Sequence, residues 1–239
     1  MSDFKIYKIK TKNKDLIKPS PLPQILPKHP ARVMFSGASR SGKTNLIVSL
    51  LSQKRFLKGY FDLIFVFSPS AMIDDAWEEL IPKIIPENHV FVSPDPETIE
   101  KILDVQNKLV EENGINKAPT LLCIFDDIID NKTILTNKAF QSLFFRGRHF
   151  SISVWIASQS YNRVPRALRL QMSNLIIFKP RKSEAKVIST ELTPAGMEEK
   201  QMIKILNHCT NEPYSFLHMN LQVDSAICFR KGLDTIVNL

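Results

Sequence analysis

The eight residues Gly37–Thr44, Gly-Ala-Ser-Arg-Ser-Gly-Lys-Thr, constrain the fold of this chain more than any other segment. They match the pattern Gly-x4-Gly-Lys-Ser/Thr, in which glycines let the backbone wrap around phosphate oxygens with its N–H groups pointing inward. The pattern needs an apolar strand before it and a helix after it, and Arg32–Ser36 and Asn45–Ser52 supply both. Because the chain has only seven glycines, a chance match is rare. The segment predicts a phosphate-binding loop; the alternative is a tight glycine turn that only opens a helix.

Each part of this loop has an expected role. Lys43 would bridge the β and γ phosphates of a nucleoside triphosphate, and the hydroxyl of Thr44 would bind Mg²⁺. The other positions would surround the phosphates with backbone N–H groups at the positive end of the helix. These positions are Gly37, Ala38, Ser39, Arg40, Ser41 and Gly42.

A second candidate site follows an apolar strand in the middle of the chain, where Thr120–Asp126 is followed by Asp127. Open α/β sheets bind ligands at the carboxyl ends of their strands, so acids at this point are well placed. Asp126 is predicted to hold Mg²⁺ through water. Asp127 is predicted to orient or deprotonate the attacking water. The alternative is two acids that cap a loop.

Strand-like and helix-like runs alternate from Arg32 onward. The predicted strands are Arg32–Ser36, Phe61–Phe67, His89–Val92, Thr120–Asp126, Ser151–Ala157 and Asn174–Phe178. The clearest helix is Pro96–Asn113, with Asp95 at its cap and Gly114 at its exit. Several strands are continuously apolar, as expected when helices cover both faces of a parallel sheet. The pattern predicts a three-layer α/β domain with a mostly parallel sheet.

Two predicted strands, Phe61–Phe67 and His89–Val92, lie between the phosphate loop and the paired acids. At least one strand is therefore expected to insert between the two motif strands in the sheet. That is the additional-strand arrangement of RecA-like motors. Small-molecule kinases and GTPases usually keep the two motif strands adjacent.

The strand Ser151–Ala157 ends in Ser158-Gln159. A polar residue at the tip of this strand senses the γ-phosphate in RecA-like motors, and Gln159 fits that position. Glutamine also ends strands simply because it is soluble, so this signal is weak when taken alone.

Two arginines flank a glycine in the segment Arg146–His149, which separates the predicted helix Asn137–Phe145 from the next strand. Gly147 is predicted to cap the helix and to fix the arginines at a turn on the sheet edge. Arg146 or Arg148, reaching the γ-phosphate of a neighbouring subunit, would contribute about 10³–10⁵ in rate. Rival candidates are Arg163, Arg166 and Arg169. The alternative is a solvated basic turn that contacts DNA or nothing.

Residues 1–30 are predicted to form a basic, proline-rich arm, and residues 31–239 a single ATPase domain. The arm combines alternating lysines with five prolines, which exclude a helix. It either contacts DNA or a neighbouring subunit, or it straps its own domain. The domain is expected to have a core at about 32–180, followed by C-terminal helices and short strands at 181–239. The short strands are Tyr214–Met219 and Ser225–Phe229.

Composition narrows the partners. The net charge of +8 and the pI near 9.4 favour a polyanionic partner such as nucleic acid. The alternative is a basic surface that binds no polyanion. The three cysteines are odd in number and far apart, which argues against a disulfide framework or a zinc site and favours a reducing intracellular compartment. No segment has the length or apolar character to span a membrane or act as a signal peptide.

Together these motifs resemble the FtsK/HerA superfamily, and within it the poxvirus-type genome-packaging ATPases of large DNA viruses and virophages. The similarity covers Arg32–Pro180. The phosphate loop is generic; the specific part is Arg146–His149 together with Ser158-Gln159 after a pair of aspartates. In two places the chain departs from the wider superfamily. Asp127 replaces a glutamate and would need a water relay, and Arg40 replaces a frequent glycine and would contact nucleotide or a neighbour.

The resemblance implies a RecA-like core, a homo-oligomeric ring, and ATP with Mg²⁺ at each subunit interface. It also implies translocation of double-stranded DNA, without sequence readout, into a preformed capsid, with capsid or vertex proteins as partners. The expected location is the host cytoplasm at the viral factory, with virion association as a variant. Two alternatives stay open: a nucleotide or small-molecule kinase, and a nucleotide-gated DNA-binding or capsid-vertex scaffold that hydrolyses too slowly to do work.

Overall fold

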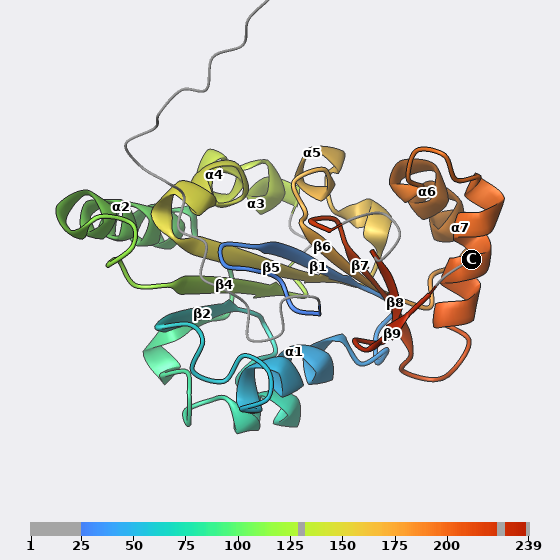
Figure 1. Cartoon of the computed structure of the whole chain (residues 1–239). Helices are drawn as coiled ribbons and strands as arrows, with labels where there is room; N and C mark the ends of the chain where they lie inside the picture. The colour runs from blue at the N-terminus through green and yellow to red at the C-terminus, as the bar shows by residue number, and fades with distance from the viewer. Residues whose placement is uncertain (1–24, 129–131, 224–227, 238–239) are drawn as a thin grey trace, which may run out of the picture.

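The computed structural model describes residues 25–128, 132–223 and 228–237, in which one sheet lies between layers of helices (Figure 1). The strands are β1 (Arg32–Ser36), β2 (Leu63–Phe67), β3 (Val90–Phe91), β4 (Leu121–Asp126), β5 (Ile152–Ser158), β6 (Asn174–Phe178), β7 (Phe216–Asn220), β8 (Phe229–Lys231) and β9 (Thr235–Ile236). The helices are α1 (Lys43–Ser52), α2 (Pro96–Asn113), α3 (Lys132–Thr136), α4 (Lys138–Arg146), α5 (Arg166–Arg169), α6 (Lys182–Leu192) and α7 (Glu199–Cys209). Of the predicted strand Ser225–Phe229, residues 225–227 lie outside the described residues.

The strand order in the described sheet is β3-β2-β4-β5-β1-β6-β7-β8-β9. The first six strands in this order, β3 through β1 to β6, run parallel to one another. Strands β7, β8 and β9 extend the sheet beyond β6, each antiparallel to the strand before it. Because β5 pairs with both β1 and β4, one strand does separate the two motif strands. The sequence predicts that at least one of β2 and β3 supplies this strand, and that is wrong, since both lie on the far side of β4. Sequence spacing counts the strands between two motifs but does not say which edge of β4 each one pairs with.

Strand β4 shows why the sheet lies between two layers, since all six of its residues are buried. Leu122 and Ile124 pack into the cluster on the α1 side. Cys123 and Phe125 pack into the cluster that α2 and α4 cover on the opposite face. Figure 1 shows α1 on one side of the sheet and α2 to α5 on the other. The predicted three-layer α/β architecture is confirmed.

Local capping sets the helix ends near the site. The carboxylate of Asp95 accepts the N–H of Thr98 at 2.9 Å, so α2 begins and ends where the sequence predicts. Helix α4 ends at Arg146, and Gly147 is its C-cap, with its N–H donated to the carbonyl of Leu143. Gly147 keeps a right-handed backbone (φ −52), however, and the chain continues as a short 3-10 turn to Phe150.

The described end of the N-terminal stretch packs against its own domain. Leu26 and His29 are buried. The imidazole of His29 lies 2.8 Å from the hydroxyl of Ser153 and 3.0 Å from that of Ser151. Residues 25–30 therefore strap the start of β5, and the lysine-rich part of the predicted arm lies outside the described residues. No helix in the described chain is long and apolar enough to cross a bilayer.

Candidate nucleotide-binding site

The predicted phosphate loop connects the end of β1 to the start of α1. Gly37 donates its N–H to the carbonyl of Ser158 at 3.1 Å, which ties the loop to the end of β5. A Cβ on Gly37 would lie 2.6 Å from the Cβ of Phe178, so only glycine fits. Gly42 (φ 102) and Arg40 (φ 61) both adopt the left-handed conformation. For Arg40 this costs roughly 1–2 kcal/mol, which gives a physical reason for the glycine common at that position.

Lys43 lies inside the loop rather than in solvent, with only 6% of its surface exposed. Its ammonium donates hydrogen bonds to the carbonyls of Gly37 (2.8 Å) and Ala38 (3.0 Å). Burial lowers the pKa of Lys43, and the negative charges of Asp127 and Asp126 oppose that shift. The loop thus holds a buried cation on its inner side, where a phosphate chain would need it.

The hydroxyl of Thr44 donates a hydrogen bond of 3.0 Å to Oδ2 of Asp126. Asp126 is buried, and its other oxygen, Oδ1, has no hydrogen-bond partner. Burial, and then the charge of Asp127, raises the pKa of Asp126 to about 6, against the opposing effects of Thr44 and Lys43. A hydroxyl and a carboxylate with an unsatisfied oxygen are the hard donors that Mg²⁺ prefers, so these residues fit the expected metal.

Asp127 and Gln159 come from neighbouring strand ends and meet at the same edge. Asp127 is exposed and adopts a left-handed backbone (φ 55), a conformation that aspartate tolerates better than most residues. Its Oδ1 accepts a long hydrogen bond of 3.4 Å from the side-chain amide of Gln159. Five residues predicted for the site therefore lie at one edge of the sheet: Lys43, Thr44, Asp126, Asp127 and Gln159.

An open cavity of about 520 Å³ lies over this edge, within the usual size range of small-molecule sites. Its lining residues are Ser39, Arg40, Ser41, Gly42, Lys43, Thr44, Asn45, Asp74, Asp127 and Tyr214. Inside the loop, the buried hydroxyl of Ser41 has no hydrogen-bond partner. A buried hydroxyl without a partner beside a polar cavity indicates a place for a polar ligand.

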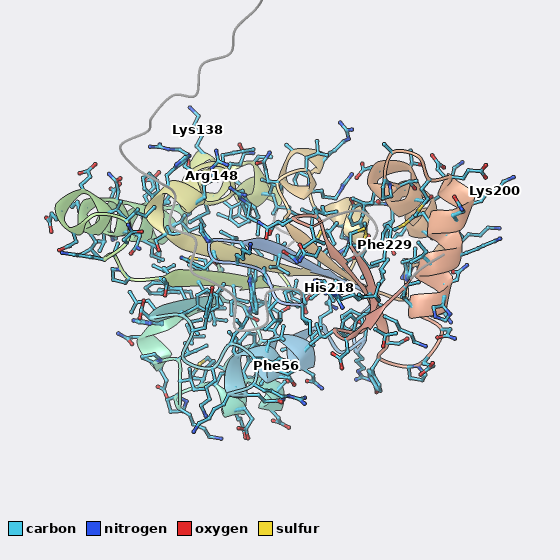
Figure 2. All side chains as sticks on the ribbon, viewed as in Figure 1. Phe56, Lys138, Arg148, Lys200, His218 and Phe229 are labelled. Carbon is cyan, nitrogen blue, oxygen red and sulfur yellow. The ribbon has the colours of Figure 1, made fainter. Side chains whose placement is uncertain are left out.

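The two candidate arginines lie elsewhere. Gly147, between them, packs against Ile152 at the start of β5, whereas the phosphate loop adjoins Ser158 at its end. A strand of this length spans about 20 Å. Arg146 and Arg148 are both exposed there, and Figure 2 shows Arg148 on the α4 side of the sheet. They do not reach the phosphate loop of their own chain.

The rival arginines differ from one another. Arg169 is buried and forms two hydrogen bonds with Glu191, at 3.0 and 2.6 Å, so its role is to hold α5 against α6. Arg166 is exposed and lies 3.6 Å from the same carboxylate. Arg163 is exposed beside Gln159, in a neighbouring polar cavity.

A family model described as "Poxvirus A32 protein" matches residues 23–231, which is most of the chain. The chain belongs to the poxvirus A32 protein family. It is 28% identical over 186 residues to the DNA packaging protein OPG160 of Variola virus, covering 75% of this chain and 64% of that one. It is 27% identical over 179 residues to the uncharacterized protein 015R of Frog virus 3, covering 70% and 52%. The chain thus spans about half to two thirds of the length of these relatives.

Solved structures share the fold of this A32-family chain. One is the DNA-packaging ATPase B204 from Sulfolobus turreted icosahedral virus, with 18% identity and a TM-score of 0.56 over 81% of this chain and 94% of that one. Another is the genome packaging NTPase B204 from Sulfolobus turreted icosahedral virus 2 in complex with AMPPCP, with 17% identity and a TM-score of 0.53 over 80% and 93%. The predicted P-loop fold with an additional strand is confirmed.

Two residues of this A32-family site were missed by the sequence analysis. Asp74 comes after β2, as Asp127 comes after β4, and its charge helps to raise the pKa of Asp126. An acid after a predicted strand was a usable signal, but six residues lie between Phe67 and Asp74. Tyr214 lies in the turn between α7 and β7, and no pattern linked it to the loop.

Proposed function

We propose that this chain is the ATP-hydrolysing motor subunit that translocates double-stranded viral DNA into a preformed capsid. The observation that carries the proposal is the hydrogen bond between Thr44 and Asp126, which joins the phosphate-loop helix to the acidic strand. A glycine turn that only opened a helix would not need a buried carboxylate at that point. The packaging role is supported by the names of the relatives, among them the DNA packaging proteins of poxviruses.

The site residues divide the chemistry among them. Backbone N–H groups of the loop would bind the phosphates, and Lys43 would bridge the β and γ phosphates. Thr44 and Asp126 would hold Mg²⁺, which neutralises phosphate charge when bound. Asp127 would orient the attacking water and accept its proton. Gln159, already bonded to Asp127, would hold that carboxylate in place and respond to loss of the γ-phosphate.

The positions of the arginines support a ring with nucleotide at each subunit interface. Arg146 and Arg148 are exposed near the amino ends of the parallel strands, whereas the phosphate loop lies at the carboxyl ends. A head-to-tail contact joins two different surfaces of identical subunits and closes into a ring when the rotation permits. In that contact, Arg146 or Arg148 of one subunit would reach the γ-phosphate site of the next.

Double-stranded DNA is proposed as the substrate from the charge of the chain as well as from its relatives. Basic surfaces that face a central channel would contact DNA phosphates without reading sequence, in keeping with the net charge of +8. Capsid or vertex proteins would anchor the ring, and the protein would act in the host cytoplasm at the viral factory, where capsids are filled.

The test is the rate of ATP hydrolysis with and without long duplex DNA at low salt. We expect Mg²⁺-dependent hydrolysis that duplex DNA stimulates and that Lys43→Ala abolishes. If duplex DNA does not change the rate of hydrolysis, the proposal of a DNA motor is contradicted, whereas the assignment of the nucleotide-binding site is not. Single-turnover kinetics separate a motor from a scaffold, because a scaffold would hydrolyse bound ATP too slowly to drive movement. Transfer of the phosphoryl group to a metabolite would instead indicate a kinase.

A further inference from the structure

Tyr214 is a large aromatic side chain in an unusual place. It is 72% exposed, and its backbone is left-handed (φ 61), which is uncommon for a bulky residue. The turn that carries it is nevertheless braced. Lys231 donates hydrogen bonds to Glu212 (2.6 Å) and Asn211 (3.3 Å), and the Ser215 hydroxyl bonds both the N–H and the carbonyl of Glu212. A strained backbone that its surroundings hold in place often marks a binding site.

The ring of Tyr214 lies against the phosphate loop. The position that a Cβ on Gly42 would occupy is 3.3 Å from Cδ1 of Tyr214. The side chain lines both the cavity over the loop and a second cavity of about 530 Å³ beyond it. The second cavity is lined by part of the phosphate loop and by the turn of residues 211–215. Tyr214 therefore stands at the border between the phosphate site and an adjoining space.

The strand order fixes which way a nucleotide would lie. The acids lie at the end of β4, the phosphate loop follows β1, and Tyr214 lies two residues before β7. In the order β4-β5-β1-β6-β7, the loop thus lies between the acids and the tyrosine, and Figure 1 shows β7 on the far side of β1 from β4. A nucleoside triphosphate is a linear molecule whose terminal phosphate must face Asp126 and Asp127. Its base then points toward β7.

We propose that Tyr214 and the turn of residues 211–215 form the base subsite, with the tyrosine ring stacked on a purine. This inference rests on the proposed nucleotide site and adds the determinant of base binding to it. Asn211 and Glu212 already accept hydrogen bonds from Lys231, so stacking supplies most of the base affinity. Stacking tolerates different bases because every base has a π face. The site therefore accepts ATP and GTP with similar affinity and binds pyrimidine nucleotides more weakly.

The experiment compares the binding of ATP and of inorganic tripolyphosphate by titration calorimetry in the presence of Mg²⁺. Tyr214→Ala should weaken ATP binding about 5- to 150-fold, in line with the loss of one base stack, and leave tripolyphosphate binding unchanged. Tyr214→Phe should bind ATP as the wild type does. Tyr214→Asn, which suits the left-handed backbone, should behave like the alanine variant and so separate ring loss from backbone strain. Val105→Ala removes an exposed apolar side chain on α2 and serves as the control.

Equal weakening of ATP and tripolyphosphate in Tyr214→Ala would overturn the base subsite, as would unchanged ATP binding. A preference for ATP over GTP greater than about 100-fold would overturn stacking as the source of base affinity. If the wild type binds neither ATP nor tripolyphosphate, the proposed function fails together with this inference. A wild type that binds both equally well contradicts the base subsite alone.

Discussion

The hydroxyl of Thr44, in the first turn of α1, donates a 3.0 Å hydrogen bond to the carboxylate of Asp126 at the end of β4, 82 residues further along the chain. Strand β5 separates β4 from β1, so the bond crosses above an intervening strand. The phosphate-loop helix and the acidic strand are thereby coupled without direct pairing of their strands. A ligand that binds between Thr44 and Asp126 acts on both elements at once.

Asp126→Asn should stabilise the metal-free protein while abolishing hydrolysis. Burial and Asp127 raise the pKa of Asp126 from 3.8 to about 6, so the ionised carboxylate destabilises the fold as pH rises from about 4 to about 6 and beyond. Removing that charge should raise the free energy of unfolding at pH 8 by about 1–3 kcal/mol. Urea unfolding in a chelator measures this. A variant less stable than the wild type would contradict the origin of the shift.

Asp127→Asn should lower kcat about 10²- to 10⁴-fold with little change in ATP affinity, because it removes the proposed general base. Asparagine tolerates the left-handed backbone at this position, so the loop should keep its shape. Steady-state hydrolysis and ATP binding are measured on the same preparation. Wild-type turnover in this variant would assign the role to another group, and Asp74 is the other acid that lines the cavity over the loop.

Arg146→Ala and Arg148→Ala test the interface. Each single variant should be inactive if its arginine is the one that acts between chains, since such a residue contributes about 10³–10⁵ in rate. Mixing the inactive arginine variant with Lys43→Ala subunits should restore part of the activity, because some interfaces then combine an intact loop with an intact arginine. No recovery with either arginine would contradict action in trans.

His218 should make stability depend on pH. The imidazole is buried, accepts a hydrogen bond from the amide of Asn174 (3.2 Å), and lies between the helical layers (Figure 2). Burial, and then the positive charge of Arg230 on β8, lowers its pKa to about 4. An unfolded histidine titrates near pH 6.5, so the unfolded chain binds more protons between pH 6.5 and 4. Stability should therefore fall by up to about 3 kcal/mol as pH drops through that window.

Urea midpoints of wild type and His218→Gln at pH 7.5, 6 and 5 measure this contribution. The variant should lose that part of the pH dependence, whereas Val105→Ala, at an exposed apolar side chain on α2, should keep the wild-type slope. Parallel slopes for wild type and His218→Gln would show that another group titrates.

Local chemistry made the elements predictable. Apolar runs bounded by turns located β1 to β6 within two residues at each end, and Asp95, Pro96 and Gly114 fixed α2. The order of the strands was not predictable in the same way. Strands β2 and β5 are both apolar on both faces, and nothing in either sequence states which edge of β4 it occupies. Their places depend on how each connection crosses the sheet, which is a property of the whole fold.

The same distinction between local patterns and whole-fold contacts applies to the residues of the site. Lys43, Thr44, Asp126 and Asp127 lie in motifs whose spacing is set by the chemistry of phosphate and metal, so the sequence located them. Tyr214 reaches the loop only because β7 adds to β6 and the turn before it is held by Lys231. Because this contact depends on three separate segments of the chain, no local sequence pattern predicts it.

The most direct test of the account is ATP affinity in the presence and absence of Mg²⁺, measured for the wild type and for Lys43→Ala. Lys58→Ala, which removes an exposed lysine near the end of α1, is the matched control. We expect the wild type and Lys58→Ala to bind ATP with an affinity that requires Mg²⁺, and Lys43→Ala to lose at least about tenfold, the cost of one charge-assisted contact. ATP binding that ignores both the metal and Lys43 would contradict the account.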